Sequence, residues 1–404
     1  MDFDLTDDQR TWLREVREFL SANVTTALTE ELWEHGRESD GPHTRTFRAR
    51  VAEQGWYGLN WPAEYGGRGR GAVDQFLLIN ELETRGIPAL LVLPVAVTTI
   101  GPTILRFGTD ENRRMWLPRI VRGEVSMALG YSEPDAGTDL ASLRTRGEPH
   151  GHHWVVTGQK LWTSEAHTAT HLWLAARTGP TSPKHSGISL FVVDMDSPGI
   201  TVRSLRTWSD LRTNEVFLDA VRIPRENLIG EADKGWRYIT AALGFERVMT
   251  AAFVASARRD FDQLVSYSRD TVVDGQPILQ RPGVRRRLAE LDRDLELGWL
   301  LGLQTAAAID RGDVPMAEAA MLKVYGSDLQ SRVARAGTEI LGPAGQLDRH
   351  DPHAPLRGAM EWLYRQAPLM RFAAGANEIQ RDIIGRAAGL PESRAGVASG
   401  RGAR

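Results

Sequence analysis

The sequence predicts a mainly helical α+β fold in which a small β domain separates two helical domains. Two observations support it. Apolar residues recur with the 3.6-residue period of a helix before about residue 124 and again after Gly235. Between them, from Val125 to about Asp219, short runs alternate with the period of two that is typical of strands. The length of 404 residues allows two or three domains with separate cores.

The first 124 residues predict helices. Thr6 is a suitable N-cap for a helix that reaches Leu20, because Trp12, Val16 and Phe19 then share one face. Helical spacing returns at residues 44–54, 73–84 and 95–107. A glycine-rich loop at residues 55–69 interrupts it, since its glycines permit positive φ angles.

The middle region predicts several short strands separated by turn-rich pieces. These runs lie at residues 126–131, 153–157, 171–176, 188–194 and 216–221. Short strands at nearly regular spacing favour a small antiparallel sheet or barrel.

The last region predicts four long amphipathic helices, at residues 236–268, 284–311, 316–341 and 360–388. Helices of this kind normally pack as a bundle. We therefore expect an N-terminal helical domain at 1–124, a β domain at 125–232 and a helical bundle at 233–391. Residues 392–404, rich in Gly, Ala, Ser and Arg, are expected to be a disordered tail.

Composition excludes several classes of chemistry. The chain has no cysteine, which rules out disulfides, thiol catalysis and cysteine-bound metals. Its formal charge of −3 gives no general attraction to nucleic acid or to an anionic membrane. The longest apolar stretch, Ala89 to Ile100, is too short to span a bilayer, and the acidic start is unlike a signal peptide. We expect a cytoplasmic protein without membrane insertion, whose clustered loop histidines are solvated.

Two short motifs carry the strongest functional signal. The turn from Tyr131 to Leu140 offers small residues, hydroxyls and backbone N–H groups that can hold a diphosphate and the polar edge of a flat ring. Trp162, followed by Thr163 and Ser164, can back such a ring while the hydroxyls bond its edge. The alternatives are a solvated turn between strands and a tryptophan that belongs to the core.

Together these motifs resemble the acyl-CoA dehydrogenase family over nearly the whole chain. Residues 61–67 are similar to its N-terminal loop, residues 221–230 to its domain junction, and residues 377–381 to its C-terminal signature. The resemblance implies FAD as the cofactor, between the β domain and the bundle. It also implies that FAD is contacted by Tyr131, Ser132, Gly137, Thr138, Trp162, Thr163 and Ser164.

The resemblance also indicates where the catalytic base lies. Many family members carry a carboxylate immediately before the glycine of the C-terminal signature, but here that position is Ala374, which cannot take a proton. Glu246 matches the place where some branches carry the base on the first bundle helix, and its neighbours Phe245 and Val248 are apolar. The backbone N–H of Ala374 can still donate to the thioester oxygen. The alternative is that Glu246 is a solvated helix-face residue.

Further expected FAD contacts come from the bundle. They are Arg269, Glu339, Gly342, Gly375, Ala376 and Glu378. The family usually has Thr at Ala376, Gln at Glu339 and an Arg-x-x-Phe-Gly segment that is missing after Arg269. With these departures, the chain looks most like actinobacterial enzymes that act on steroid side-chain CoA thioesters as α2β2 heterotetramers. Drift within a homo-oligomer is the other explanation.

The expected activity is the α,β-dehydrogenation of an acyl-CoA or carrier-protein thioester, with Glu246 as the base and flavin N5 as the hydride acceptor. Electron-transferring flavoprotein is the expected electron acceptor. Three alternatives stay open: a flavin-dependent oxygenase or N-hydroxylase on the same fold, a non-catalytic partner subunit, and a helical scaffold without activity. The sequence alone does not choose the acyl group.

Overall fold

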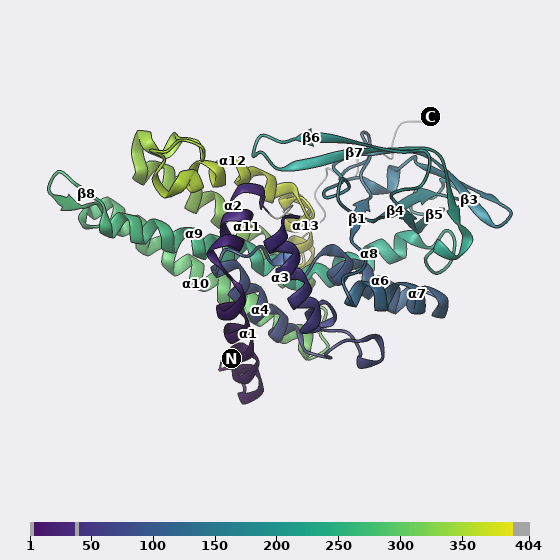
Figure 1. Ribbon diagram of the computed structural model, residues 1–404, viewed down its shortest axis with the longest axis horizontal. Coiled ribbons are helices and arrows are strands. Elements are labelled where there is room, and N and C mark those ends of the chain that lie inside the picture. The colour runs from purple at the N-terminus through teal and green to yellow at the C-terminus, as the bar shows by residue number, and fades with distance from the viewer. Residues whose placement is uncertain (1–3, 37–39, 391–404) are drawn as a thin grey trace. The chain divides into compact units, whose positions relative to one another are not determined.

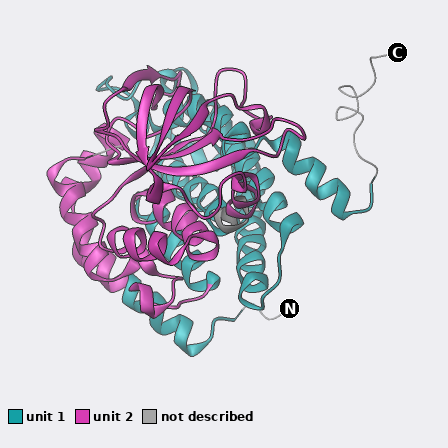
Figure 2. Cartoon of the chain, turned by 90° about the vertical axis from the view of Figure 1, so that its right-hand side faces the viewer, with its two compact units in different colours: residues 1–16, 72–86, 248–404 teal, residues 17–71, 87–247 magenta. Residues whose placement is uncertain are grey.

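The computed structural model describes residues 4–36 and 40–390, and for residues 243–247 it describes the backbone without the side chains. The predicted tail at 392–404 therefore lies outside the described residues. The chain divides into two compact units, each assembled from segments far apart in the sequence (Figure 2). The helical unit comprises Met1–Val16, Ala72–Gly86 and Val248–Arg404, and the β unit comprises Arg17–Gly71 and Ile87–Arg247.

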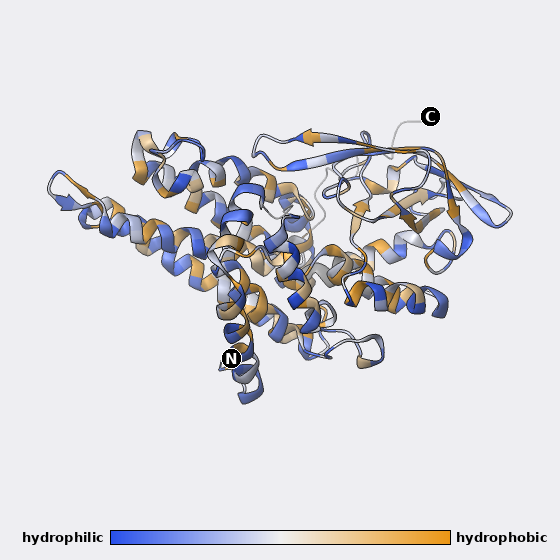
Figure 3. Cartoon of the chain, in the orientation of Figure 1, coloured by the Kyte–Doolittle hydropathy of each residue, from blue (hydrophilic) through white to orange (hydrophobic). Residues whose placement is uncertain are grey.

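The helical unit is organised around one long helix, α11 (Met316–Leu341), whose bounds confirm the predicted 316–341 segment. It packs against α9, α10, α12 and α13. The other helices of this unit are α4 (Ala72–Thr84), α9 (Ala251–Asp270), α10 (Pro282–Asp310), α12 (Ala359–Phe372) and α13 (Asn377–Ala387), together with the first half of α1 (Asp7–Asn23). Figure 3 shows both hydrophilic and hydrophobic residues along these helices, as amphipathic packing requires.

Small residues on α11 allow its neighbours to come close. A Cβ added at Gly326 would lie 2.9 Å from Cβ of Phe253 on α9, and one at Gly337 would lie 2.4 Å from Sδ of Met360 on α12. Because real Cβ atoms do not approach other atoms so closely, these glycines set the spacing of the bundle.

Two predicted helices are broken in the structure. The 360–388 segment is split into α12 and α13, because Ala374 and Gly375 have φ angles of 52° and 90°, which a right-handed helix cannot contain. The 236–268 segment is split into α8 (Gly235–Phe245), the 3₁₀ turn η7 (Glu246–Thr250) and α9. Both breaks fall at positions for which a catalytic role is expected.

The β unit contains a seven-stranded sheet with the order β1-β4-β2-β3-β7-β6, in which β5 also pairs with β4 (Figure 1). The strands are β1 (Met127–Gly130), β2 (Arg146–His150), β3 (His153–Lys160), β4 (His171–Arg177), β5 (Ile188–Asp194), β6 (Ile200–Arg206) and β7 (Arg212–Pro224). The sheet is mixed rather than purely antiparallel, because β1 runs parallel to β4. Parallel pairing fits the long connection between them, which contains the β2–β3 hairpin.

The strands β2 and β6 have no counterpart in the sequence-based expectation. β2 contains Gly147 and Pro149, which are uncommon in strands, and β6 is an edge strand with mostly polar, exposed positions. The strongly apolar β4 and β5, by contrast, are buried along almost their whole length and form the core with β3 and β7.

The β unit also carries short helices. They are α2 (Thr26–His35), α3 (Pro42–Glu53), α5 (Ala89–Val92), the π-helix η4 (Ala96–Ile100), α6 (Gly101–Phe107), α7 (Asp110–Val121) and α8. At the start of the chain the Thr6 cap is confirmed: its hydroxyl accepts from the N–H of Gln9, whose side chain accepts from the N–H of Thr6. No helix in the described part of the chain is long and apolar enough to cross a membrane.

Candidate active site

The Tyr131 segment (residues 131–140) follows directly on β1. Its first part is a tight turn in which Glu133 and Ala136 exchange backbone hydrogen bonds of 3.0 and 3.1 Å around Pro134 and Asp135. The phenol oxygen of Tyr131 accepts a hydrogen bond of 2.9 Å from Nε1 of Trp173. Beyond the turn, Gly137 and Thr138 are exposed, and a Cβ at Gly137 would meet no atom within 4 Å. Space and polar groups are thus available along this segment.

The Trp162 segment (residues 160–164) begins with the last residue of β3. Trp162 has a φ of 62° and is 59% exposed, although a large aromatic residue favours neither a left-handed backbone nor contact with water. The neighbouring Thr163 is fully buried, and its hydroxyl has no hydrogen-bond partner among the described residues. A strained, exposed ring beside an unpaired buried hydroxyl indicates a ligand site.

The backbone of Thr163 is held from β7. Its N–H donates to the carbonyl oxygen of Asn214 at 3.0 Å, and Nδ2 of Asn214 donates to the carbonyl oxygen of Thr163 at 2.8 Å. This two-way contact keeps Trp162 in its left-handed conformation.

A pocket of about 190 Å³ opens beside Trp162. It is mostly apolar, with Ser164 and Glu165 as its polar members, and is lined by Leu90, Pro94, Val95, Met127, Leu129 and Trp162. An aromatic residue, an apolar wall and the hydroxyl of Ser164 suit a flat ring that has one polar edge.

Glu133 and Lys160 join the two segments through a buried ion pair of 2.8 Å. The Lys160 side chain is completely buried, and its ammonium group also donates to the carbonyl oxygen of Tyr131 at 3.1 Å. Burial lowers the pKa of Lys160 to about 8, against the attraction of Glu133. Burial alone would raise the pKa of Glu133, but the Lys160 charge and the hydrogen bonds that Glu133 accepts lower it.

In the helical unit, the turn between α12 and α13 holds Ala374, Gly375, Ala376 and Glu378. Ala374 is exposed, and its N–H donates to no acceptor within residues 4–36 and 40–390. Ala376 is the N-cap residue of α13, and Glu378 lies in its first turn. The N–H of Ala374 is therefore available to bind a ligand oxygen.

A second buried lysine contacts a backbone carbonyl on one side of this turn and a side-chain amide on the other. Lys323 on α11 is 1% exposed and donates to the carbonyl oxygen of Arg371 at 3.0 Å and to Oδ1 of Asn377 at 2.7 Å. Burial lowers its pKa to about 8, although the negative charges of Glu378 and Asp328 act against this.

Glu246 is the first residue of η7, where the helix tightens between α8 and α9. Its side chain lies outside the described residues. A short 3₁₀ stretch within a longer helical run is a frequent feature of functional or strained positions.

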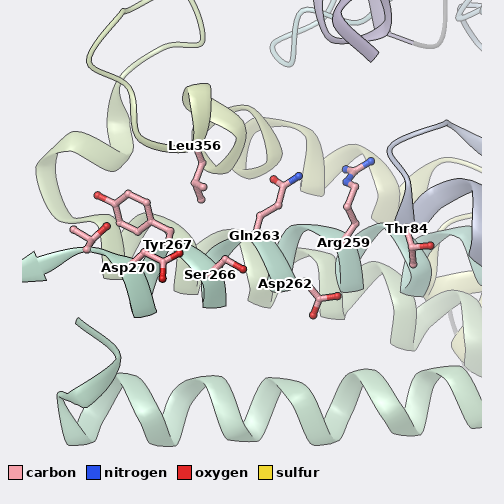
Figure 4. A pocket seen from close by; sticks show the side chains of 9 residues that line it. Thr84, Arg259, Asp262, Gln263, Ser266, Tyr267, Asp270 and Leu356 are labelled. Carbon is pink, nitrogen blue, oxygen red and sulfur yellow. The ribbon is translucent and has the colours of Figure 1, made fainter. Parts of the chain in front are cut away.

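The three remaining predicted residues lie at helix ends of the helical unit. Arg269, near the end of α9, is exposed and pairs with Asp270 at 2.8 Å. Glu339, at the end of α11, lies 3.7 Å from Arg287, and Gly342 caps that helix with a φ of 63°. An open pocket of about 560 Å³ lies beside α9; it is lined by Thr84 of α4, by residues of α9 that include Tyr267 and Asp270, by Thr271 and by Leu356 (Figure 4). Arg269 is not among its lining residues.

The chain belongs to the acyl-CoA dehydrogenase family. The family models of the N-terminal, middle and C-terminal domains match residues 6–124, 128–221 and 233–389. Members of this family are FAD-dependent oxidoreductases, and this chain is an acyl-CoA dehydrogenase.

Particular relatives extend over almost the full length. Acyl-CoA dehydrogenase FadE26 of Mycobacterium tuberculosis is 35% identical over 399 residues, which cover 96% of this chain and 98% of that protein. The solved ChsE4-ChsE5 complex from Mycobacterium tuberculosis contains a chain with a TM-score of 0.88 and 35% identity, covering 97% of this chain and 100% of that one. A structure described as the Tcur3481-Tcur3483 steroid ACAD gives a TM-score of 0.87 and 35% identity, covering 97% and 100%.

The residues of the β unit fit the flavin that the family requires. Trp162 offers a flat apolar face, and the buried hydroxyl of Thr163 lacks the partner that a ring heteroatom would supply. The exposed backbone at Gly137 and Thr138 leaves room for phosphate oxygens.

The structure adds residues that were not singled out from the sequence: Glu133, Lys160 and Asn214 in the β unit, and Lys323 and Asn377 in the helical unit. The sequence did contain a pattern that indicates a buried Lys160. With Trp154 and Val156 it continues the alternation that marks the buried face of β3. A lysine on a buried face must have a partner, and this one has Glu133.

Proposed function

We propose that this chain removes a proton and a hydride from the α and β carbons of an acyl thioester, with FAD held by the Tyr131 and Trp162 segments. The observation that carries the flavin site is the left-handed, exposed Trp162 beside the unpaired hydroxyl of Thr163. Such strain persists only where the surrounding structure maintains it, and it gathers at ligand sites.

Several residues contribute to the proposed FAD site. The ring of Trp162 provides a stacking face, the hydroxyls of Thr163 and Ser164 hydrogen-bond the polar edge of the flavin, and Tyr131 and Ser132 lie along the same site. Gly137 and Thr138 receive the diphosphate through backbone N–H groups and a hydroxyl. Gly375, Ala376 and Glu378, and from another subunit Arg269, Glu339 and Gly342, complete the set of proposed contacts.

The chain's own groups provide the acid–base part of the reaction. The carboxylate of Glu246 takes the α-proton, which is made acidic by the neighbouring thioester. The N–H of Ala374, which has no acceptor among the described residues, donates to the thioester oxygen as that atom gains negative charge, and a backbone donor needs no side chain for this. FAD held by the Tyr131 and Trp162 segments would supply the acceptor for the β-hydrogen and its electron pair. The product is a 2-enoyl thioester, and an electron-transferring flavoprotein is the proposed next electron carrier.

The assignment of Glu246 rests on the sequence and on the helix break at that residue. The Glu246→Gln variant should keep its FAD but lose about 10²–10⁴-fold in the rate of anaerobic flavin bleaching by acyl-CoA, which is the contribution of a positioned base. Bleaching at the wild-type rate would reject Glu246 as the base. Adding Ala374→Glu to the inactive variant supplies a carboxylate at the position used elsewhere in the family, and partial rescue is expected.

Preparations that are colourless and cannot be reconstituted with FAD would count against the flavin site itself. Rapid reaction of the reduced protein with oxygen would favour an oxygenase instead of a dehydrogenase.

We further propose a steroid CoA thioester as the substrate and a paralogous chain as the partner that completes the site. Support comes from the solved relatives at 35% identity, one described as a steroid ACAD and both as assemblies of two different chains. The changes at Ala376, Glu339 and beyond Arg269 fall on residues that the family uses near a neighbouring subunit's flavin. A homotetramer of this chain with one FAD per subunit would overturn the heteromeric proposal. Comparing straight-chain, branched and steroid CoA thioesters tests the substrate.

A further inference from the structure

The ion pair between Glu133 and Lys160 connects the two segments proposed to hold the flavin. Lys160 is the last residue of β3 and lies two residues before Trp162, whereas Glu133 lies within the Tyr131 segment. Both are buried: the side chains are 0% and 8% exposed. The next residue along, Leu161, donates from its N–H to the carbonyl oxygen of Ser132 at 2.9 Å, so the segments are joined by backbone as well as by charge.

Glu133 is held in place by several donors. Besides Lys160, its carboxylate accepts from the backbone N–H of Arg144 at 2.6 Å and of Thr145 at 2.9 Å, just before β2. Lys160 in turn donates to the carbonyl oxygen of Tyr131 at 3.1 Å. Charge-assisted hydrogen bonds of this length are directional, so the two side chains fix the spacing at the point where β1 and β3 end and β2 begins.

At the far end of the Tyr131 segment, another buried cation bonds the backbone. Arg177 on β4 is 9% exposed and donates from Nη2 to the carbonyl oxygen of Ala141 at 2.7 Å. The positive charges of Lys160 and Arg177 therefore lie at the two ends of the segment. Burial lowers the pKa of Arg177, and the negative charge of Glu133 partly offsets this.

Stability alone does not explain why such a pair is there. Replacing a buried ion pair by well-packed apolar side chains is often neutral or stabilising, because taking two charges out of water costs about as much as their attraction returns. What an apolar pair cannot provide is a set of directional contacts to the carbonyl oxygen of Tyr131 and to two backbone N–H groups.

We propose that Glu133 and Lys160 are positioning residues, whose buried ion pair holds the Tyr131 and Trp162 segments at the spacing that FAD binding requires. The inference rests on the proposed role of these two segments as the flavin site. Neither side chain needs to touch the flavin: their buried atoms act through the backbone of Tyr131 and through the end of β3.

The main test is the double variant Glu133→Gln with Lys160→Met, which removes both charges and keeps similar side-chain volumes. Apoprotein stability is measured by urea unfolding, and the FAD dissociation constant by flavin fluorescence titration, in the assembly in which the wild-type chain binds FAD. The double variant should fold and bind FAD at least about tenfold more weakly, the change that corresponds to 1.4 kcal/mol. The visible flavin spectrum should shift as well, since the ring is less firmly seated.

The matched control is Val221→Ala, which removes buried methyl groups from the core of the same sheet, away from both segments. It lowers apoprotein stability but should leave the FAD dissociation constant within about twofold of wild type, a change worth less than 0.5 kcal/mol. If the double variant binds FAD as tightly as Val221→Ala, the pair is merely structural and the inference is overturned.

A milder variant covers the case in which the double variant does not fold. Glu133→Asp keeps the charge pair but is one methylene shorter, so it cannot reach Lys160 and the two backbone N–H groups together. Weaker FAD binding with nearly unchanged urea stability supports positioning, and unchanged binding overturns it. If the wild-type chain itself binds no FAD, the proposed function fails instead, so the two failures are distinguishable.

Discussion

Each unit contains a buried lysine that bonds nearby backbone, but the two lysines have different partners. Lys160 in the β unit and Lys323 in the helical unit are both almost completely buried, and burial lowers the pKa of each to about 8. Each lies near a left-handed residue in the sequence or bonds the backbone near one: Lys160 is two residues before Trp162 and donates to the carbonyl oxygen of Tyr131, and Lys323 donates to the carbonyl oxygen of Arg371, three residues before Ala374. Only Lys160 has a carboxylate partner in contact, since within the described residues Lys323 bonds a carbonyl oxygen and the amide oxygen of Asn377.

The difference indicates what each lysine contributes. A cation with a bonded carboxylate is held firmly, and its removal leaves an uncompensated buried charge. A cation with neutral acceptors is tied less strongly, and its removal leaves only polar groups without partners. The Tyr131 and Trp162 segments of the β unit, which we propose bind the flavin, should therefore be the more rigid, and the turn that presents the Ala374 N–H the more easily displaced.

The largest expected effect comes from replacing each lysine by methionine. Lys160→Met should cost the β unit about 3–5 kcal/mol, because it leaves Glu133 charged and buried. Lys323→Met should cost the helical unit about 1–3 kcal/mol, because the carbonyl of Arg371 and the amide of Asn377 lose a donor. Hydrogen exchange of amides in β3 and in α11 measures the two units separately. Equal losses would remove the distinction between the lysines.

The next effect tests whether a carboxylate makes Lys323 resemble Lys160. Asn377→Asp places a negative charge within hydrogen-bond reach of the ammonium group, and should raise the Lys323 pKa by about one unit or more. The shift is measured by NMR titration of isotopically labelled lysine side chains. Asn377→Ala is the control and should lower the pKa further. A Lys323 pKa that is the same in both variants as in the wild type would show that Asn377 does not govern the charge of Lys323.

A smaller effect is expected from relieving the backbone at Ala374, where φ is 52°. Ala374→Gly removes a Cβ that costs about 1–2 kcal/mol in a left-handed conformation, partly offset by the entropy that glycine loses on folding. The net gain for the helical unit is about 0.5–1 kcal/mol, visible as a higher urea midpoint with an unchanged slope. Destabilisation would mean that the methyl group of Ala374 is packed in the native state.

The last expected effect concerns pH: a Lys323 pKa lowered from 10.5 to about 8 corresponds to about 3 kcal/mol between the two protonation states. The Lys323 pKa is lower in the folded than in the unfolded chain, so between about pH 8 and pH 10 the unfolded state binds more protons. The wild type should therefore gain stability relative to Lys323→Met as pH rises through this window, and the difference should be flat below it. The charges of Glu378, Asp328, Arg371 and Arg381 act on the same group, so the comparison is made at constant ionic strength. If the stability difference between the wild type and Lys323→Met shrinks as the pH rises, folding raises the Lys323 pKa instead of lowering it.

Much of the fold could be predicted because it depends on periodicity. The change from a period of 3.6 to one of 2 at Val125, and the return after Gly235, is written in the order of apolar residues. The helix at 316–341 and the strands β4 and β5 follow directly from this pattern. The polar edge strand β6 could not, because its pairing with β7 is made by backbone groups that no side-chain pattern reveals.

The sequence by itself determined the family, the order of helical and β regions, and the absence of a carboxylate at Ala374, because residue identities and local periods carry that information. The tertiary structure decided the rest. It made Trp162 exposed and left-handed, left the Thr163 hydroxyl without a partner in the described part of the chain, and brought Lys160 to Glu133 across 27 residues. Such features arise when distant segments fold against one another, and the free energy of a buried charge depends on partners that only folding supplies.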